Sequence, residues 1–392
     1  MFKTRMNADM ALELFLASFE PLTGSENLNV EKCDGRVSAE DITAKTDVPH
    51  YRRAAMDGFA VKASDTLGGG STSPVILKTG DSIGKGSCVR VHTGSAVPEG
   101  ADAVVMVEDT QTHGGIVEVF TQVHPLKNVG EIGEDIRKGE MVIKKGKLLR
   151  PCDIGVIASL GIREIKVFRK PVVAIIPTGE ELIPKGDALP GIGEVYETNG
   201  LMTELYIRKW GGVPGLHNIV TDNPGMIKSA IKANLDADMI IICGGTSVGK
   251  RDFVPGVVAS LGKLVVHGVG ISPGKPTALG IINGKPVICM PGYPVAGIVA
   301  LYWFGKEALR KLGNMPREYE TTVRAVLSEK IASRTGFKTF ARVRLENGHA
   351  VPLATSGAGI LSSVSKADGF VVIPENIEGY EKGETVEVKL ID

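Results

Sequence analysis

The sequence contains little of what marks secreted, membrane-bound or nucleic-acid-binding proteins. Its five cysteines are scattered and form no CxxC pair, which argues against a disulfide framework or a zinc site. The longest apolar stretch, at 295–305, is well short of the ~18 residues that a membrane-spanning helix requires. Lys plus Arg and Asp plus Glu both number 45, so the formal net charge is zero and a basic face for nucleic acid or anionic membrane is not expected.

A secretory signal is also lacking at the start of the sequence, because Asp9 and Glu13 interrupt any apolar run. Together these absences predict a cytoplasmic protein without a nucleic-acid or membrane partner. The cysteines are then expected to be buried free thiols. They are Cys33, Cys88, Cys152, Cys243 and Cys289.

Glycine, by contrast, is abundant: it accounts for 49 of the 392 residues, or about one in eight, against a typical share of ~7%. Hydrophobic residues make up 43% of the chain, which is enough for packed cores, so disorder does not explain the excess. The extra glycines are therefore expected in turns. At ~150 residues per domain, the length predicts about two to four domains.

The pattern of the chain changes twice. Asn7 is placed to cap a first helix that ends near Pro21. From about 28 to 147, short alternating runs are separated by Gly, Asp and Pro, which is typical of β structure, and a short helix follows at 151–160. Beyond 315 the chain returns to short strands, such as 321–327, 339–345 and 369–373.

Between 171 and 312, strands and helices alternate. The continuous apolar runs 172–176 and 239–243 predict parallel strands that are buried on both faces. Helices are expected at 198–210, 224–235, 253–261 and 295–312. The fold class is therefore multidomain α/β plus β, with a central three-layer α/β domain, β-rich N-terminal domains and a small β domain at the C-terminal end.

Glycine and proline turns follow the predicted strands of the α/β part. They are 177–181, 244–249, 272–276 and 291–294. In an open parallel sheet, ligands bind beyond the carboxyl ends of the strands, and glycine turns present N–H groups to anions. The turn 244–249, with Lys250, Arg251 and Lys275 nearby, is neither a Walker loop nor a dinucleotide fingerprint. It is a candidate cradle for a phosphate or another oxyanion.

Carboxylates accompany these turns, namely Glu180, Glu181, Asp222 and Asp252. Carboxylates and phosphates repel one another unless a hard cation joins them, and Mg²⁺ commonly uses one or two carboxylates together with ligand phosphates. The residues alone therefore predict a magnesium-assisted site for a phosphorylated ligand.

Structural explanations stand beside this interpretation. Thr178-x-x-Glu181 has the form of a helix capping box, Asp222 precedes a helix start at Asn223-Pro224, and Asp252 could cap the helix at 253–261. In the N-terminal β part, Asp57-Gly58 is a hairpin signal with Asp57 as a turn residue.

The turn-dense stretches 93–102 and 133–139 also lie in the β-rich part. Polar loops of this density on a β scaffold suggest a binding edge.

Taken together, these strings resemble the molybdopterin molybdenumtransferase family, which includes MoeA-type enzymes and the E domain of gephyrin. The strings occur in the family's order and span most of the chain. They are Ala55-Met56-Asp57-Gly58-Phe59-Ala60-Val61, Thr93-Gly94-Ser95-Ala96-Val97-Pro98, Gly133-Glu134-Asp135-Ile136, Thr178-Gly179-Glu180-Glu181-Leu182, Gly244-Gly245-Thr246-Ser247-Val248-Gly249, Pro273-Gly274-Lys275-Pro276 and Pro291-Gly292-Tyr293-Pro294.

The resemblance implies four domains. They are an elongated discontinuous domain at 1–48 and 140–169, an inserted β domain at 49–139, an α/β domain of the molybdopterin-binding type at 170–313, and a C-terminal β-barrel at 314–392. It also implies a homodimer, with each active site between the α/β and C-terminal domains of one subunit and the inserted domain of the other.

The implied reaction takes adenylylated molybdopterin and molybdate (or tungstate). It cleaves the phosphoanhydride with Mg²⁺, releases AMP and leaves the metal on the dithiolene. A molybdopterin adenylyltransferase is the implied upstream partner.

By match to the family's motifs, the resemblance assigns roles to individual residues. Catalytic roles fall to Asp57, Asp135, Asp252 and Lys275. Binding of the molybdopterin and molybdate substrates falls to Thr93, Thr178, Gly179, Gly244, Gly245, Ser247, Pro291, Gly292 and Arg342. The metal side falls to Glu181, Asp222 and Asp252.

The sequence departs from the family pattern at three positions. Ser272 stands where the family often has Lys, which removes a positive charge near the expected oxyanion site. Tyr293 replaces a common Asn, and Glu180 a common Asp.

Two other functions remain as alternatives. A molybdopterin adenylyltransferase needs only the α/β unit, so the β-rich parts disfavour it. A non-catalytic scaffold of the same fold would have lost its acidic residues, whereas Glu181, Asp222 and Asp252 are present.

Overall fold

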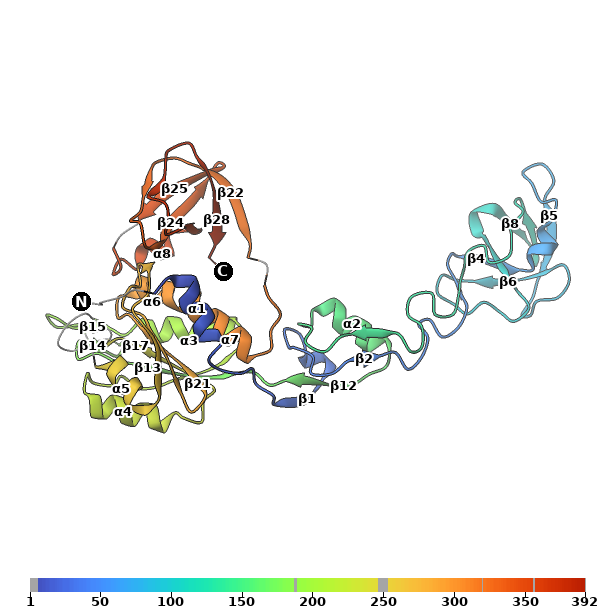
Figure 1. Ribbon diagram of the computed structural model, residues 1–392. Coiled ribbons are helices and arrows are strands. Elements are labelled where there is room, and N and C mark those ends of the chain that lie inside the picture. Colours follow the sequence, from blue (N-terminus) through green and yellow to red (C-terminus); the bar gives the residue numbers. More distant parts are fainter. Residues whose placement is uncertain (1–5, 187–188, 246–252, 319, 355–356, 392) are drawn as a thin grey trace.

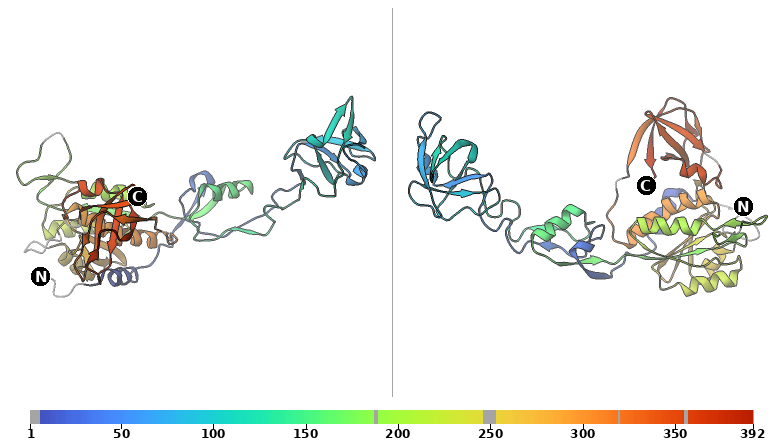
Figure 2. Two further views of the ribbon diagram at one scale, coloured as in Figure 1. Left: turned by 90° about the horizontal axis from the view of Figure 1, so that it is seen from above. Right: turned by 180° about the vertical axis from the view of Figure 1, so that it is seen from behind.

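The computed structural model describes residues 6–186, 189–245, 253–318, 320–354 and 357–391. The molecule is elongated: a small β region lies at one end, a larger body at the other, and a narrow arm joins them (Figure 1, Figure 2). The body contains an α/β unit and, above it in Figure 1, a C-terminal barrel. The predicted fold class is confirmed.

The arm is built from chain segments on both sides of the small β region. β1 (Ser25–Asn29) pairs antiparallel with β12 (Glu164–Phe168). β2 (Ile42–Thr43) pairs with β11 (Met141–Ile143), and α2 (Pro151–Ser159) begins at the predicted proline. Apolar side chains of these segments share one core, so the arm is a folded element and not a linker.

The distal β region, as we call the elements from β3 to β10, contains a six-stranded sheet in the order β7-β4-β6-β5-β9-β8. Its strands are β4 (Gly58–Val61), β5 (Val75–Thr79), β6 (Ser87–Val91), β7 (Ala103–Met106), β8 (Thr110–His113) and β9 (Ile116–Val119). Two further short strands, β3 (Arg53–Ala54) and β10 (Val129–Gly130), pair with each other. In β9 the alternation expected of a half-buried strand is present, because Val117 and Val119 are buried in the region's core.

The hairpin expected at Asp57-Gly58 is wrong. β3 pairs with β10, whereas β4 begins at Gly58 and lies between β6 and β7. A Cβ atom on Gly58 would lie 1.9 Å from the carbonyl oxygen of Val105 on β7. Glycine is therefore required here by the close approach of a neighbouring strand and not by a turn.

The α/β unit contains a six-stranded sheet in the order β16-β13-β17-β21-β20-β18. Its strands are β13 (Val172–Pro177), β16 (Val213–Leu216), β17 (Met239–Cys243), β18 (Lys263–His267), β20 (Ala278–Ile282) and β21 (Lys285–Met290). The first four strands in the sheet order run parallel, which confirms the prediction for 172–176 and 239–243, and β20 and β18 add an antiparallel edge.

Helices cover both faces of this sheet, which gives the predicted three layers. They are α3 (Asn199–Lys209), α4 (Pro224–Ala233), α5 (Val254–Leu261), α6 (Pro294–Ala300) and α7 (Lys306–Leu312). α3, α6 and α7 pack into one apolar core, and α4 and α5 into the core on the opposite face. The helix expected as a single element over 295–312 is interrupted by a π-helical turn at Leu301–Gly305.

The C-terminal barrel closes five strands in the order β24-β25-β22-β28-β26, with β26 paired back to β24. They are β22 (Thr322–Leu327), β24 (Lys338–Glu346), β25 (His349–Ala354), β26 (Gly369–Ile373) and β28 (Thr385–Leu390). A short strand of the α/β unit, β19 (Ile271–Ser272), pairs in parallel with β24, so that Ser272 lies opposite Thr339. This pairing joins the barrel to the α/β unit.

The first helix, α1 (Ala8–Leu16), packs against both parts of the body. Asn7 caps it as predicted, because its side-chain oxygen accepts hydrogen bonds from the backbone N–H groups of Asp9 (2.8 Å) and Met10 (3.0 Å). The buried face of α1 joins the core of the α/β unit. On the barrel side, Asp9 forms an ion pair with Lys338 (2.5 Å), and the side-chain amide of Asn7 donates a hydrogen bond to Glu375.

The prediction that the cysteines are buried free thiols is confirmed for four of the five. All five cysteines are free thiols, and four are buried, whereas Cys152 is exposed at the start of α2 because its side chain points away from the arm core. Complete burial raises the pKa of Cys243 to about 12. Among the helices of the described residues, none has the length and apolarity to span a bilayer.

Candidate functional site

The carboxyl ends of three neighbouring strands are held together by backbone hydrogen bonds. The N–H of Thr178, just after β13, donates to the carbonyl of Cys243 at the end of β17 (2.8 Å). The N–H of Gly244 donates in turn to the carbonyl of Met290 at the end of β21 (3.1 Å). These bonds bring the predicted turns to one edge of the sheet, as expected from the strand-end rule. We call the residues gathered here the strand-end cluster: Thr178, Gly179, Glu181, Asp222, Gly244, Gly245, Pro291 and Gly292.

Glycine is required where the cluster is most crowded. Gly244 has φ +114°, and a Cβ atom there would lie 2.2 Å from the carbonyl oxygen of Thr178. Gly245 has φ +64°, and its Cβ would lie 2.5 Å from a methyl carbon of Val254. A Cβ atom on Gly292 would lie 3.7 Å from the Cα of Gly244, so the two turns touch. Part of the glycine excess is thus explained by close packing of backbone at this edge.

Two of the predicted carboxylates belong to the cluster. A Cβ atom on Gly179 would lie 2.9 Å from Oε1 of Glu181, so this carboxylate lies over the turn that follows β13. Thr178 forms a parallel bridge with Val220, which places Asp222 two residues further along the same edge. Glu181 is exposed, whereas Asp222 is half-buried. The cluster therefore combines carboxylate oxygens with glycine-rich backbone.

The structural explanation is wrong for Glu181, whereas the helix start predicted at Asn223-Pro224 beside Asp222 is confirmed. The residues after Glu181 form the short strand β14 (Leu182–Ile183), so there is no helix for a capping box. The cap of α4 is Asn223, whose side-chain oxygen accepts from the N–H groups of Gly225 (2.8 Å) and Met226 (3.2 Å). Asp222 is therefore not the capping residue of that helix.

Asp252 and Ser247 lie outside the described residues, as do Lys250 and Arg251. Within the ranges that the structure describes, no three His, Cys, Asp or Glu side chains are close enough to form a metal site by themselves. Glu181 and Asp222 still fit the donor set that Mg²⁺ prefers when phosphates of a ligand complete the coordination.

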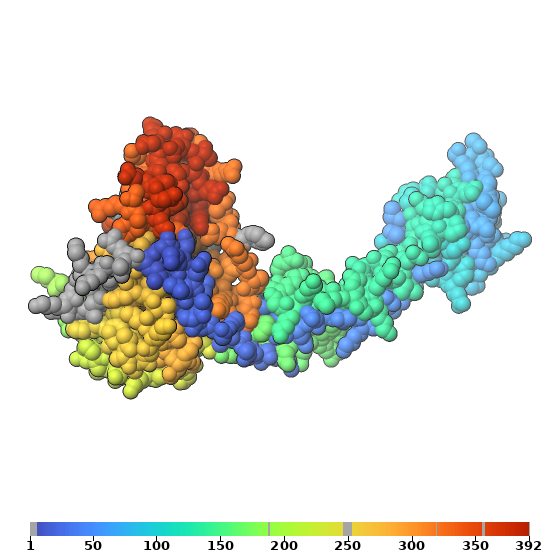
Figure 3. Space-filling view, viewed as in Figure 1, coloured from blue at the N-terminus to red at the C-terminus, as the bar shows by residue number. Residues whose placement is uncertain are grey.

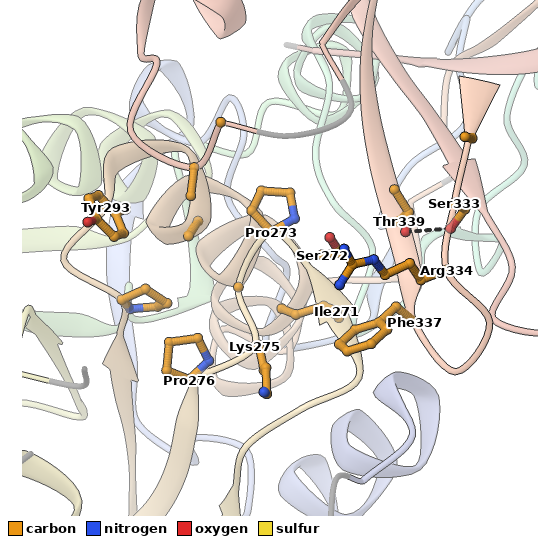
Figure 4. Close-up of a pocket in the computed structure, with 16 residues that line it drawn as sticks. Ile271, Ser272, Pro273, Lys275, Pro276, Tyr293, Ser333, Arg334, Phe337 and Thr339 are labelled. Atoms are coloured by element: carbon orange, nitrogen blue, oxygen red, sulfur yellow. Dashed lines mark hydrogen bonds between the residues drawn. The ribbon is translucent and has the colours of Figure 1, made fainter. Parts of the chain in front are cut away.

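A cavity of about 630 Å³ lies between the α/β unit and the barrel (Figure 4). One wall is the turn 271–276 with Pro291 and Tyr293, and the other is the barrel segment around 332–339. The pairing of Ser272 with Thr339 joins the two walls. The predicted residues Lys275 and Pro291 line this cavity.

Sequence reasoning missed the barrel wall. Ser333, Arg334, Phe337 and Thr339 line the cavity, and the hydroxyl of Ser333 donates to that of Thr339 (2.7 Å). The segment carries a turn signal at Gly336, but a turn signal does not tell which part of the chain lies opposite. The connection arises from the β19–β24 pairing, which has no local signature.

Arg342 lies on β24 and is completely buried, and this burial lowers its pKa. It occupies the same face of the strand as Phe340, which packs into the core of the α/β unit. Arg342 is not among the described residues that line the cavity. The structure thus places it near the boundary of the two parts but inside the packed interior.

The remaining predicted residues lie in or next to the distal β region. The N–H and hydroxyl of Thr93 donate to the carboxylate of Asp57 (2.6 Å and 2.9 Å), and these hydrogen bonds lower the pKa of Asp57. The N–H of Asp135 donates to the carbonyl of Val48 (3.1 Å), where the distal region meets the arm. In one chain, Asp57 and Thr93 are separated from the strand-end cluster by the whole arm (Figure 1, Figure 3).

Comparison with known proteins accounts for nearly the whole chain. Residues 6–161 match the model of the MoeA N-terminal region (domain I and II), residues 174–311 a "probable molybdopterin binding domain", and residues 324–391 the MoeA C-terminal region (domain IV).

Relatives and solved structures give the same result. A Methanocaldococcus jannaschii protein described as a molybdopterin biosynthesis protein is 40% identical over 93% of each chain. The molybdopterin molybdenumtransferase of Haemophilus influenzae is 30% identical over 98% of each chain. The crystal structure of the molybdopterin biosynthesis MoeA protein from Pyrococcus horikoshii superposes with a TM-score of 0.87 at 33% identity, covering 99% of this chain and 100% of that one. The chain therefore belongs to the MoeA family of molybdopterin molybdenumtransferases, which are enzymes of molybdenum cofactor biosynthesis.

Proposed function

We propose that the chain inserts molybdate or tungstate into adenylylated molybdopterin, with Mg²⁺-dependent cleavage of the phosphoanhydride and release of AMP. The observation that carries this proposal is the joining of two unlike sites at one sheet edge. The strand-end cluster offers carboxylates beside glycine turns whose backbone a ligand can approach closely, and the adjoining cavity offers Lys275, with Pro291 belonging to both. The first suits a phosphorylated ligand with a hard cation, and the second suits an oxyanion.

Glu181 and Asp222 would hold Mg²⁺, together with Asp252. When bound, the ion supplies positive charge that offsets the charge of the phosphates as the anhydride breaks. The backbone at Thr178, Gly179, Gly244 and Gly245 would bind and orient the molybdopterin substrate, with Ser247, Pro291 and Gly292 beside it. Lys275 would stabilise the negative charge that develops on the leaving phosphate oxygen. Arg342 remains a candidate contact for the metal oxyanion.

We further propose a homodimer in which a second copy completes each site. Asp57, Thr93 and Asp135 lie far from the strand-end cluster of their own chain, and the elongated arm would carry them to the cluster of a partner. The division into 1–48 with 140–169, 49–139, 170–313 and 314–392 belongs to this proposal. So do a cytoplasmic location and a molybdopterin adenylyltransferase as the upstream partner.

The first experiment incubates the purified full-length chain with adenylylated molybdopterin, molybdate and Mg²⁺ and follows AMP. We expect AMP release that depends on Mg²⁺ and falls in Glu181→Gln and Asp222→Asn. An absence of AMP above background would contradict the transferase proposal. AMP release that persists in both variants would contradict the site assignment and leave the reaction class standing.

The shared site is tested by mixing two inactive variants. Asp57→Asn removes a group contributed by the distal β region, and Lys275→Ala removes one from the cavity. If each site combines two chains, mixed dimers hold one intact site, and mixing restores about a quarter of the wild-type rate, since half of the dimers are mixed and each has one good site. Mixing without any recovery would contradict the shared site.

A further inference from the structure

The cavity between the α/β unit and the barrel has an unusual balance of charge. Among the described residues that line it, Lys275 and Arg334 are cationic and none is acidic. Carboxylates lie instead at the strand-end cluster, in Glu181 and Asp222. An anion without a bound cation is favoured where cations and hydroxyls surround it and carboxylates are absent.

Arg334 comes from the barrel wall and faces the turn of the α/β unit. Figure 4 shows its guanidinium extending across the cavity toward Ser272. Two contacts hold Arg334 near Ser272. The pairing of β19 with β24 places Ser272 opposite Thr339, and the Thr339 hydroxyl accepts a hydrogen bond from Ser333, the neighbour of Arg334. In the part of the chain that the structure describes, the Arg334 guanidinium has no hydrogen bond or ion pair. Its donors are thus available to a ligand.

Position 272 is often Lys in the molybdopterin molybdenumtransferase family, but this chain has Ser272 there. The turn itself therefore contributes Lys275 as its cation. The geometry points to Arg334 as the group that supplies the second positive charge, from the opposite wall. We propose that Arg334 and Lys275 together bind a tetrahedral metal oxyanion, molybdate or tungstate, in this cavity, with the hydroxyl of Ser272 beside it.

This assignment rests on the proposed function for the identity of the oxyanion. It differs from the expectation placed on Arg342, which is completely buried and does not line the cavity among the described residues, whereas Arg334 is exposed. The planar guanidinium of Arg334 can donate two parallel hydrogen bonds to two oxygens of one anion. Phosphate groups of the pterin substrate would lie at the strand-end cluster, where carboxylates can share a cation with them. Because Pro291 belongs to both the cluster and the cavity, Lys275 keeps its proposed role toward the leaving phosphate oxygen beside the bound oxyanion.

The test is equilibrium dialysis of the full-length protein against molybdate, with bound molybdenum measured by mass spectrometry and inorganic phosphate as competitor. We expect Arg334→Gln to weaken molybdate binding by about tenfold or more, because a charge-assisted hydrogen bond is lost. Arg334→Lys is expected to recover part of the affinity. The matched control is Arg324→Gln, which removes an exposed arginine of β22, also on the barrel, and is expected to leave binding unchanged.

A double variant tests whether the positive charge of Arg334, and not its exact position, is what binding requires. Adding Ser272→Lys to Arg334→Gln places a cation on the opposite wall, and we expect it to restore binding. Equal molybdate affinity in wild type and Arg334→Gln would overturn the proposal, and so would phosphate competing as strongly as molybdate. Wild-type protein that retains no molybdate would also overturn it. AMP release is measured on the same preparations, so failure of the proposed reaction is recognised separately from failure of the Arg334 assignment.

Discussion

Replacing Gly244 by alanine is expected to disrupt the strand-end cluster. The new Cβ atom would lie 2.2 Å from the carbonyl oxygen of Thr178, closer by about 1 Å than an ordinary contact, and this backbone carbonyl cannot rotate away as the end of a side chain could. Alanine at φ +114° adds about 1–3 kcal/mol of backbone strain. Displacing Thr178 adds about 1–3 kcal/mol of overpacking. The expected loss in the free energy of unfolding is therefore about 2–6 kcal/mol.

A second glycine of the same unit provides the control. Gly256 lies on the exposed side of α5, and a Cβ atom there meets nothing within 4 Å. Gly256→Ala makes the same chemical change and is expected to raise stability by up to about 1 kcal/mol, because alanine loses less conformational freedom in a helix than glycine.

The assay is urea unfolding followed by tryptophan fluorescence. The chain has two tryptophans, and both Trp210 and Trp303 belong to the core of the α/β unit, so the signal reports on the part that is perturbed. AMP release in Gly244→Ala is expected to fall about 100-fold, since a shift of ~1 Å in substrate-positioning groups has effects of that size. The reasoning is refuted if Gly244→Ala unfolds at the same urea concentration as Gly256→Ala or wild type.

Three further outcomes are expected. Arg169→Gln should lower stability by about 2 kcal/mol in the same urea assay, because it leaves the buried carboxylate of Asp238 without its two 2.6 Å bonds. Salt-bridged Asp153, whose pKa is lowered to about 2 because hydrogen bonds from Arg150 and Lys147 outweigh burial, should contribute stability at neutral pH that is lost as pH falls from about 4 to about 2. Asp153→Asn should therefore flatten the acid limb of a pH–stability curve measured by urea unfolding. Thr93→Val removes one of the two hydrogen bonds that lower the Asp57 pKa, so that pKa should rise partway toward its ordinary value in an NMR titration; an unchanged titration would contradict the contact.

Features that depend on neighbouring residues could be predicted from the sequence. The runs 172–176 and 239–243 are apolar at every position, so only a strand covered on both faces could accommodate them. Asn7 indicated the start of α1 because a capping side chain hydrogen-bonds to backbone N–H groups no more than three residues away. The turns at Gly179, Gly244 and Gly292 could be assigned to one edge because parallel strands all end on the same side.

Features that depend on distant pairing could not be predicted. Gly58 reads as a turn residue, and only the position of Val105 on β7 explains why a side chain is excluded there. Likewise, Arg334 follows Ser272 by about 60 residues and belongs to an ordinary polar turn. The pairing of β19 with β24, which brings them to one cavity, is decided by how two folded parts meet.

The contacts of α1 have a consequence for the order in which the protein is made. Asp9 is separated from Lys338 by 329 residues, and Asn7 from Glu375 by 368. At ~5–20 residues per second, a ribosome needs about 15–70 s to synthesise the chain between Asp9 and its partner. The distal β region, which has a core of its own, can fold during that time. The buried face of α1 contacts β18 and α7, and its polar side chains contact the barrel, so α1 cannot complete its contacts until the segments that carry Lys338 and Glu375 have emerged. It is therefore among the last elements to dock fully.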